Sequence, residues 1–583
     1  MSVTVLKGIS ASPGIAIGKA FLYHKEDFWV EERTIGAHET EAEVRRFLEA
    51  VDQVTSELQE TKRRMEEELG KEQARIFEAH LAMLKDRTAL DETALRIREE
   101  LKNAEFAFFR TLRKIVKALR ATEDTYLKER IEDVLDIQRR VMLKLVGKKH
   151  PSLIGLKDES IVVARNLAPS DTARMHRKGL LGFLTELGGQ TSHTAIMARS
   201  MEIPAVVGTK RAMEEIEPGA ILILDGTHGV VYVHPDEALL CEYRKRKQRW
   251  TEMAADLATL RDLSATTLDG KSVVVAANIE FPDEVDSVTA HGAEGIGLYR
   301  TEFLYMMDSH LPPEEEQFEA YCSVVERIAP HPVVIRTVDL GGDKLADSLP
   351  IEPETNPFLG WRAIRVCLDR EDLFREQLRA ILRASARGKV RIMFPMISGI
   401  EELWRAKEIV EGVKEALRKE GKDFDAHCPV GTMIEIPSAV MIADQLAEAS
   451  DFFSIGTNDL VQYTLAVDRG NERIASLFDP LHPAVLRLIR ETIEAGHRKG
   501  IPVAMCGEMS GDPLATLVLL GLGLDEFSMS PIAIPEVKMI VRGIRFEEAK
   551  AVADEVMKLG TKAEIRAFLE DVVRSKFGNL LLE

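Results

Sequence analysis

Charged side chains interrupt the apolar runs in the second half of this 583-residue chain. Arg300 lies inside one apolar run, in the segment GLYRTE, and Arg336 lies inside another, in the segment IRTVD. An unpaired charge inside an apolar strand is costly, so both guanidinium groups are expected to face a ligand. Glu435 and Asp459 supply carboxylates from two further runs. Mg²⁺ prefers carboxylate oxygens, so this pair is a suitable start for a Mg²⁺ site that substrate and water oxygens complete.

Each of these residues also has an explanation without chemistry. Arg336 could pair with Asp339 or Asp343, which lie close to it in sequence. Glu435 could belong to a structural ion-pair network, since such networks also hold buried carboxylates. Cys506 could be a small buried apolar residue, which is the commonest fate of a free cysteine. Residue type and spacing leave these alternatives open.

A histidine follows a pair of glycines in the first half of the chain. Residues 188–193 read GGQTSH and lead into TAIMAR, a pattern that predicts a turn, a hydroxyl cap and the start of a helix. A phosphoryl group on His193 would then lie near unpaired backbone N–H groups and the positive end of the helix dipole, with Arg199 further along the helix. The alternative is a capping histidine with no chemistry.

The apolar runs that carry the charged residues recur eight times after residue 268. They span 272–279, 295–302, 332–340, 390–398, 429–438, 451–460, 501–509 and 526–530. Helical or turn-rich spacers separate them, and this alternation predicts a (β/α)8 barrel. The candidate residues fall late in their runs or just after them, and these are Arg300, Arg336, Glu435, Asn458, Asp459 and Cys506. Barrel enzymes build their sites at this end of the strands, which favours the barrel.

The first half of the chain shows two kinds of sequence pattern, which predict two further domains. Within 25–147, Val44, Phe47, Val51, Val54 and Leu58 recur at steps of three and four, as on one face of a helix. We expect a bundle of long helices there. It is inserted into a compact α/β domain of residues 1–24 and 148–235, which is rich in β-branched runs. A linker helix at 236–262 and the barrel at 263–583 would follow.

Composition is that of an ordinary globular protein and excludes several other classes. Hydrophobic residues make up 45% of the chain and charged residues 30%, with no stretch of the ~18 apolar residues that span a bilayer and no signal-peptide pattern. The five scattered cysteines form no C-x-x-C pair, which indicates reduced thiols and a cytoplasmic location. The formal net charge of −19 disfavours nucleic acid and anionic membranes, and it favours a small basic protein partner.

The histidine loop resembles a known family. GGQTSHTAIMARSMEIPAVVG at 188–208 is similar to the phosphohistidine segment of the phosphoenolpyruvate-utilising enzymes. This family includes Enzyme I of the sugar phosphotransferase system, phosphoenolpyruvate synthase and pyruvate phosphate dikinase. The resemblance implies that His193 is the residue phosphorylated. It also implies that Thr172, in the segment PSDT, orients this histidine and that Arg199 supports it.

The barrel motifs resemble those of Enzyme I. They are RTVDLGGDK at 336–344, NPFLGWRAIR at 356–365, SIGTNDLVQYTLAVDR at 454–469 and AMCGEMSGDP at 504–513. The resemblance implies substrate binding by Arg300, Arg336, Asn458, Asp459 and Arg469, Mg²⁺ binding by Glu435 and Asp459, proton donation by Cys506 and a supporting role for Arg362.

The resemblance covers essentially the whole chain and implies one function. Phosphate would pass from phosphoenolpyruvate to His193 and on to a histidine of the carrier protein HPr, with release of pyruvate, as the first step of sugar uptake. The α/β domain would be the phosphohistidine domain, and the helical bundle at 25–147 would bind HPr. The barrel would bind phosphoenolpyruvate with Mg²⁺ as cofactor and would form a homodimer.

Two other functions compete with this one. Phosphoenolpyruvate synthase and the dikinase share the histidine and the barrel. The family resemblance implies that their chains also carry a large N-terminal nucleotide-binding domain. Here the α/β domain begins almost at once and no P-loop signature is present, so ATP is not expected. A catalytically silent regulatory scaffold would bind partners through an acidic bundle, and the intact barrel motifs argue against it.

Overall fold

A computed structural model of the chain describes most of its residues. These are 3–23, 33–69, 81, 83–84, 87–121, 134, 137–138, 140–142, 144–145, 159–167, 179–188, 198, 203–306, 311–341, 354–469, 471, 474 and 477–578. Three predicted site residues, Thr172, His193 and Arg199, lie outside this part of the chain. The chain divides into two compact units, Met1–Arg249 and Trp250–Glu583.

The first unit contains an eight-stranded sheet with the strand order β1-β8-β7-β3-β4-β5-β6-β2. Its strands are β1 (Thr4–Lys7), β2 (Ile9–Ser12), β3 (Ile15–Tyr23), β4 (Ser160–Ala164), β5 (Leu180–Thr185), β6 (Ala205–Val207), β7 (Ile221–Asp225) and β8 (Val230–Val233). Every residue of β4 is buried, as expected for a β-branched strand in the middle of a sheet. The N-terminal strands join this sheet, because β3 pairs with β4 in parallel and with β7 in antiparallel orientation. The short helix α9 (Ala212–Glu215) follows β6, and the long helix α10 (Glu237–Ala258) follows β8.

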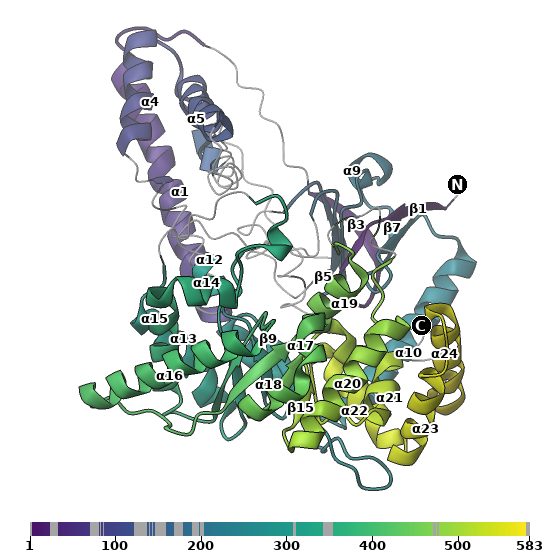
Figure 1. Ribbon diagram of the computed structural model, residues 1–583. Helices are drawn as coiled ribbons and strands as arrows, with labels where there is room; N and C mark the ends of the chain where they lie inside the picture. Colours follow the sequence, from purple (N-terminus) through teal and green to yellow (C-terminus); the bar gives the residue numbers. More distant parts are fainter. Residues whose placement is uncertain are drawn as a thin grey trace. The chain divides into compact units, whose positions relative to one another are not determined.

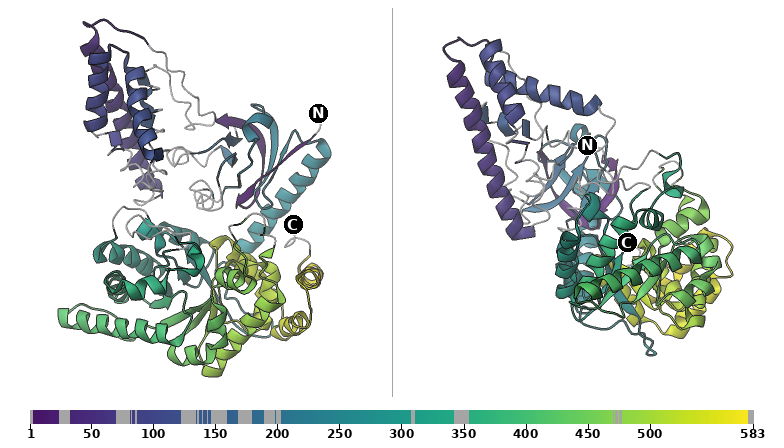
Figure 2. Two further views of the ribbon diagram at one scale, coloured as in Figure 1. Left: turned by 45° about the horizontal axis from the view of Figure 1, so that its top comes forward. Right: turned by 60° about the vertical axis from the view of Figure 1, so that its left-hand side comes forward.

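A group of helices separates β3 from β4 along the chain. The helices α1 (Thr40–Leu69), α4 (Arg87–Glu100) and α5 (Ala104–Ala121) lie side by side (Figures 1 and 2). The five apolar α1 residues predicted to share a face are all buried: Val44, Phe47, Val51, Val54 and Leu58. The rings of Phe47 and Phe108 pack with centroids 5.3 Å apart. The predicted insertion of a helical bundle into the α/β domain is therefore confirmed.

The second unit contains a closed barrel of eight parallel strands. The strands are β9 (Val274–Ile279), β10 (Ile296–Tyr299), β11 (Val333–Arg336), β12 (Val390–Phe394), β13 (Val430–Ile434), β14 (Phe453–Ile455), β15 (Val503–Met505) and β16 (Glu526–Met529). Each strand lies within one of the eight predicted apolar runs, and β16 closes the barrel by pairing with β9. The predicted (β/α)8 barrel is confirmed.

Helices cover the outside of the barrel (Figure 2). They are α11 (Val285–Ala290), α12 (Glu302–Met306), α13 (Glu314–Ile328), α14 (Ile364–Asp369), α15 (Glu371–Ala384), α16 (Ile400–Glu420), α17 (Pro437–Met441), α18 (Ala443–Ala449), α19 (Thr457–Leu465), α20 (Pro483–Lys499), α21 (Pro513–Gly521), α22 (Ile534–Gly543), α23 (Phe546–Val556) and α24 (Lys562–Phe577). In the described part of this unit, a 3-10 turn precedes each of four helices: η1 (Pro282–Glu284), η2 (Pro357–Leu359), η4 (Glu508–Gly511) and η5 (Pro531–Ala533). Among the residues that the structure describes, no helix is both long and apolar enough to cross a membrane.

The barrel interior is filled by side chains rather than open. Leu298, Val334, Met393, Met433, Phe452 and Cys506 form one buried cluster within it. Side chains on a strand alternate between its two faces, so a residue two positions further along points the same way. Arg336 follows Val334 by two positions, and Glu435 follows Met433 in the same way. The interior apolar layer therefore supports charged residues at the C-terminal end of the strands.

Candidate active site

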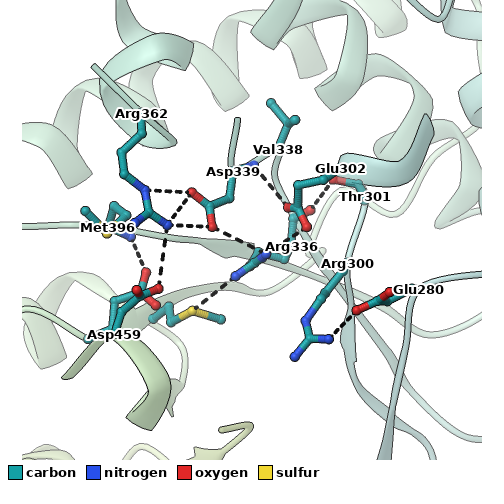
Figure 3. Close-up of polar contacts among 12 residues, drawn as sticks. Glu280, Arg300, Thr301, Glu302, Arg336, Val338, Asp339, Arg362, Met396 and Asp459 are labelled. Atoms are coloured by element: carbon teal, nitrogen blue, oxygen red, sulfur yellow. Dashed lines mark hydrogen bonds and ion pairs between the residues drawn. The ribbon is translucent and has the colours of Figure 1, made fainter. Parts of the chain in front are cut away.

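Arg336 ends β11 and is held by two carboxylates. Its side chain is buried, and Nη2 donates a hydrogen bond of 2.9 Å to Glu302 and lies 3.5 Å from Asp339 (Figure 3). Burial alone would lower the pKa of this guanidinium, but Glu302 and Asp339 raise it overall. The predicted pairing of Arg336 with Asp339 is confirmed, and Asp343 lies outside the described residues. Because both partners are acidic, Arg336 is a fixed cation whose position is set before any ligand arrives.

Arg362 forms a second fixed cation beside the first. Its Nη2 donates to both oxygens of Asp339 at 3.0 Å, and it lies 3.6 Å from Asp459 (Figure 3). Its Nη1 donates at 3.2 Å to the hydroxyl of Tyr463 on α19. Asp339 therefore joins the two buried arginines, since it accepts from Arg362 and faces Arg336.

Glu435, which directly follows β13, and Asp459, which lies in the first turn of α19, form a buried acidic pair. Glu435 accepts a hydrogen bond of 2.6 Å from the backbone N–H of Met396. Burial raises the pKa of Glu435 to about 8, and Asp459 and Asp339 add to the effect. Oδ1 of Asp459 is buried with no hydrogen-bond partner, although such atoms are nearly always satisfied. Gly456 leaves room for this pair, because a Cβ there would lie 2.6 Å from Oε2 of Glu435.

These two carboxylates fit a hard divalent cation. An unpartnered buried oxygen and a carboxyl with a raised pKa are both features that a bound cation would satisfy. Among the described residues, no group of three or more His, Cys, Asp or Glu side chains has a metal-binding arrangement. Glu435 and Asp459 would supply two ligands, and substrate and water would take further positions, as Mg²⁺ commonly accepts.

The other predicted substrate residues lie after neighbouring strands. Arg300 follows β10 and forms an ion pair with Glu280, which follows β9 (Figure 3). Asn458 is the second residue of α19, and its side-chain oxygen accepts a hydrogen bond of 3.1 Å from the backbone N–H of Glu508. Arg469 follows α19, where its backbone N–H donates to Gln462 at 3.2 Å.

Cys506 directly follows β15 and belongs to the interior cluster. The residue is 3% exposed, and its thiol donates a weak hydrogen bond of 3.8 Å to the carbonyl oxygen of Ile455. Burial raises the pKa of this thiol to about 11, although Arg336 and Arg300 favour the thiolate. The group is therefore protonated at neutral pH and able to act as an acid. If Cys506 were only a small buried apolar residue, its burial would be explained. The charged groups around its thiol would not be explained.

Sequence reasoning missed the side chains that hold the arginines. Glu280, Glu302 and Tyr463 were not predicted, and Asp339 was considered only as a partner of Arg336. Glu302 lies in the apolar run 295–302, two residues after Arg300, and Asp339 lies in the motif RTVDLGGDK, three residues after Arg336. A buried arginine with an acidic residue two or three positions away is a signal that could have identified both.

Removing Asp339 should destabilise the barrel strongly, because two buried arginines lose a shared carboxylate. We expect Asp339→Ala to lower the free energy of unfolding by ~3–5 kcal/mol, the usual loss when one partner of a buried ion pair is removed. Guanidinium denaturation, with hydrogen exchange measured on the barrel strands, would test this. Asp444→Ala is the matched control, because it removes a carboxylate that binds Arg498 on the surface, and it should change stability little. Equal effects of the two substitutions would contradict this account of the network.

Family models match the chain along most of its length. The PEP-binding domain of PEP-utilising enzymes matches residues 254–546, the N-terminal model matches 7–130 and the mobile-domain model matches 156–229. The chain belongs to the PEP-utilising enzymes. The family predicted from the histidine loop and the barrel motifs is thus confirmed. Enzymes of this family use a divalent metal ion, in agreement with the acidic pair Glu435 and Asp459.

Curated relatives of this PEP-utilising enzyme match it from end to end. A protein of Haemophilus influenzae is 47% identical over 567 residues, which cover 97% of this chain and 99% of the relative. A protein of Bacillus subtilis is 46% identical over 569 residues, which cover 98% and 100%. Both are named phosphoenolpyruvate-protein phosphotransferase. Among solved structures, an NMR solution structure of Enzyme I is 41% identical and covers 42% of this chain and 99% of its own, with a TM-score of 0.38.

Proposed function

We infer that the chain is a phosphoenolpyruvate-protein phosphotransferase, which takes phosphate from phosphoenolpyruvate and passes it to a protein carrier with release of pyruvate. The observation that carries this inference is the match along the whole chain to relatives with this name. The barrel site adds a physical reason. Phosphoenolpyruvate carries a phosphate and a carboxylate, and the site offers fixed arginines beside a buried acidic pair.

Substrate binding is assigned to the arginines and α19. Arg300 and Arg336 would bind the anionic groups, and Asn458, Asp459 and Arg469 would complete the site, with Arg362 in support. Arg336 and Arg362 are already aligned by Asp339, so little side-chain reorganisation opposes binding. Glu435 and Asp459 would hold Mg²⁺, which neutralises charge on the phosphate and the enolate when bound.

The proposed reaction is an in-line transfer to His193. A neutral imidazole nitrogen attacks phosphorus, the bond from phosphorus to the enol oxygen breaks, and pyruvate enolate leaves. Cys506 then gives its proton to the enolate carbon, which yields pyruvate, and solvent returns a proton to the thiolate. Thr172 would orient His193, and Arg199 would support the phosphoryl group. His193 and the barrel belong to different units, so we propose that the units move relative to one another during the cycle.

The domain roles and partners extend this proposal. We assign residues 1–24 and 148–235 to the phosphohistidine domain, 25–147 to binding of the carrier HPr, 236–262 to the linker and 263–583 to the barrel and a homodimer interface. The bundle is the natural platform for a partner, because it is inserted between β3 and β4 and none of the catalytic assignments falls within it. All five cysteines are free thiols, which supports a cytoplasmic site of action.

The proposed function is tested by mixing the protein with phosphoenolpyruvate, Mg²⁺ and HPr, with and without ATP. Pyruvate should form in equal amount to phosphorylated HPr, and ATP should change neither. Dependence on ATP would instead favour a synthase or dikinase, and the absence of both products would favour a silent scaffold.

Deleting the helical bundle should separate phosphoryl transfer to His193 from phosphoryl transfer to HPr. β3 and β4 are parallel neighbours, so the deletion needs a crossover linker of about a dozen Gly and Ser residues in place of 25–147. We expect the variant to be phosphorylated by phosphoenolpyruvate on His193 but to transfer phosphate to HPr at a rate reduced by ~10²-fold or more, because the docking surface is lost. Quench-flow measurement of both transfers would decide. Transfer to HPr at the normal rate would place the platform elsewhere.

A further inference from the structure

The backbone carbonyl of Cys506 has a side-chain partner that the proposed mechanism does not use. Asn278, the penultimate residue of β9, donates a hydrogen bond of 2.9 Å from Nδ2 to this carbonyl oxygen. The two residues are 228 positions apart in sequence. The contact also crosses β16, because β16 pairs with β15 on one side and with β9 on the other.

This contact forms where the strand ladder stops. The last paired residue of β15 is Met505, which lies opposite Phe527 of β16. Cys506 comes next, and its backbone N–H still donates to Ile455 on the β14 side at 3.1 Å. Among the described residues, no backbone N–H donates to the carbonyl of Cys506, and Nδ2 of Asn278 is its donor. The peptide that follows the thiol-bearing residue is therefore fixed by a side chain instead of by the sheet.

A second residue sets the direction of the Asn278 amide. The hydroxyl of Ser528 on β16 donates a hydrogen bond of 2.6 Å to Oδ1 of Asn278. Because a carbonyl oxygen can only accept, Nδ2 must face Cys506 and Oδ1 must face Ser528. Gly297 leaves room for this serine, since a Cβ at that position would lie 2.5 Å from its Oγ.

The other side of the same peptide is also confined. A Cβ on Gly507 would lie 1.7 Å from Oγ1 of Thr457 and 2.7 Å from its backbone nitrogen. Cys506 and Gly507 are thus held between α19, which carries Asn458 and Asp459, and the Ser528–Asn278 pair. A shift of the peptide would move the thiol relative to these residues.

We propose that Asn278, oriented by Ser528, is a positioning residue that aims the Cys506 thiol at the substrate carbon. The inference rests on the proposed function, in which Cys506 protonates the enolate. Proton transfer needs donor and acceptor within hydrogen-bond reach, and a displacement of about 1 Å can cost ~10²-fold in rate. Loss of the Asn278 contact therefore affects proton delivery to carbon, whereas phosphoryl exchange between His193 and the carrier does not use the thiol.

The test compares two half-reactions in single turnovers of the full chain. One is pyruvate formation from phosphoenolpyruvate, and the other is phosphoryl return from phosphorylated carrier to His193. Asn278→Ala should slow pyruvate formation by ~10-fold or more, and Ser528→Ala should slow it less, because Asn278 remains. The solvent deuterium isotope effect on pyruvate formation should rise in both variants. Phosphoryl return from phosphorylated carrier to His193 should keep its rate.

Two further variants make the outcome decisive. Ser385→Ala removes buried side-chain contacts to Leu382 and Asp425 at the opposite end of the barrel, and it should change neither half-reaction. Cys506→Ala is run in parallel. A loss in Cys506→Ala together with a full rate in Asn278→Ala would overturn the positioning role alone. Full pyruvate formation in Cys506→Ala would overturn the acid assignment and the positioning role with it, and equal losses of both half-reactions in Asn278→Ala would reduce Asn278 to a structural residue.

Discussion

Replacing His193 by alanine is expected to abolish phosphorylation of the chain by phosphoenolpyruvate and all transfer to HPr, while phosphoenolpyruvate binding persists. The nucleophile is lost, whereas the binding residues belong to a barrel with its own hydrophobic core in a separate unit. Intact-mass spectrometry would measure phosphorylation, and calorimetry would measure phosphoenolpyruvate binding in the presence of Mg²⁺.

His228→Ala is the matched control for this substitution. His228 lies in the same unit, in the turn between β7 and β8, where its Nδ1 contacts Asp225 at 2.9 Å. Its replacement should leave phosphorylation intact. A phosphorylated intermediate that persists in His193→Ala at another residue would end the assignment of His193.

Replacing Cys506 by alanine should slow pyruvate formation by ~10²-fold or more and leave phosphoryl return from the carrier nearly unchanged. The thiol serves only the step that protonates the enolate carbon. Phosphoryl exchange between His193 and the carrier histidine involves no proton transfer to carbon. Single-turnover measurements in both directions would separate the two effects. Because burial raises the pKa of this thiol to about 11, the native enzyme should lose no rate through its deprotonation between about pH 7 and pH 9.

Cys428→Ala provides a matched control for Cys506→Ala. Cys428 is also a buried free thiol, and burial raises its pKa to about 12, but it precedes β13 at the opposite end of the barrel. Its replacement should cost some stability and change neither half-reaction. If Cys506→Ala slowed both half-reactions equally, the cause would be a folding defect, and if it slowed neither, Cys506 would be only a core residue.

The barrel could be predicted from sequence because its strands carry a local signal. Each strand is a short apolar run between turn-rich or helical spacers, and all eight runs contain one strand. The same holds for α1, where the spacing of Val44, Phe47 and Val51 identified the buried face. Arg336 was recognised as a site candidate because an unpaired charge inside an apolar strand is costly. Glu435 was recognised because it supplies a carboxylate, the kind of ligand that Mg²⁺ prefers.

The contacts within the site could not be predicted in the same way. The pairing of Arg336 with Glu302 depends on β10 lying beside β11, and the pairing of Arg362 with Asp459 joins residues 97 positions apart. The bond between Asn278 and Ser528 spans 250 positions and exists only because the last strand closes on the first. Such contacts follow from barrel closure, which no local pattern encodes.

The central claim is that His193 accepts the phosphoryl group of phosphoenolpyruvate, and mapping the phosphorylated residue tests it most directly. The purified chain would be mixed with phosphoenolpyruvate and Mg²⁺, without ATP and without carrier, and digested under conditions that preserve phosphohistidine. Peptide mass spectrometry should then find one phosphoryl group per chain, on His193, with an equal amount of pyruvate in solution. A phosphoryl group on another residue, or pyruvate released without any phosphorylated chain, would contradict the account.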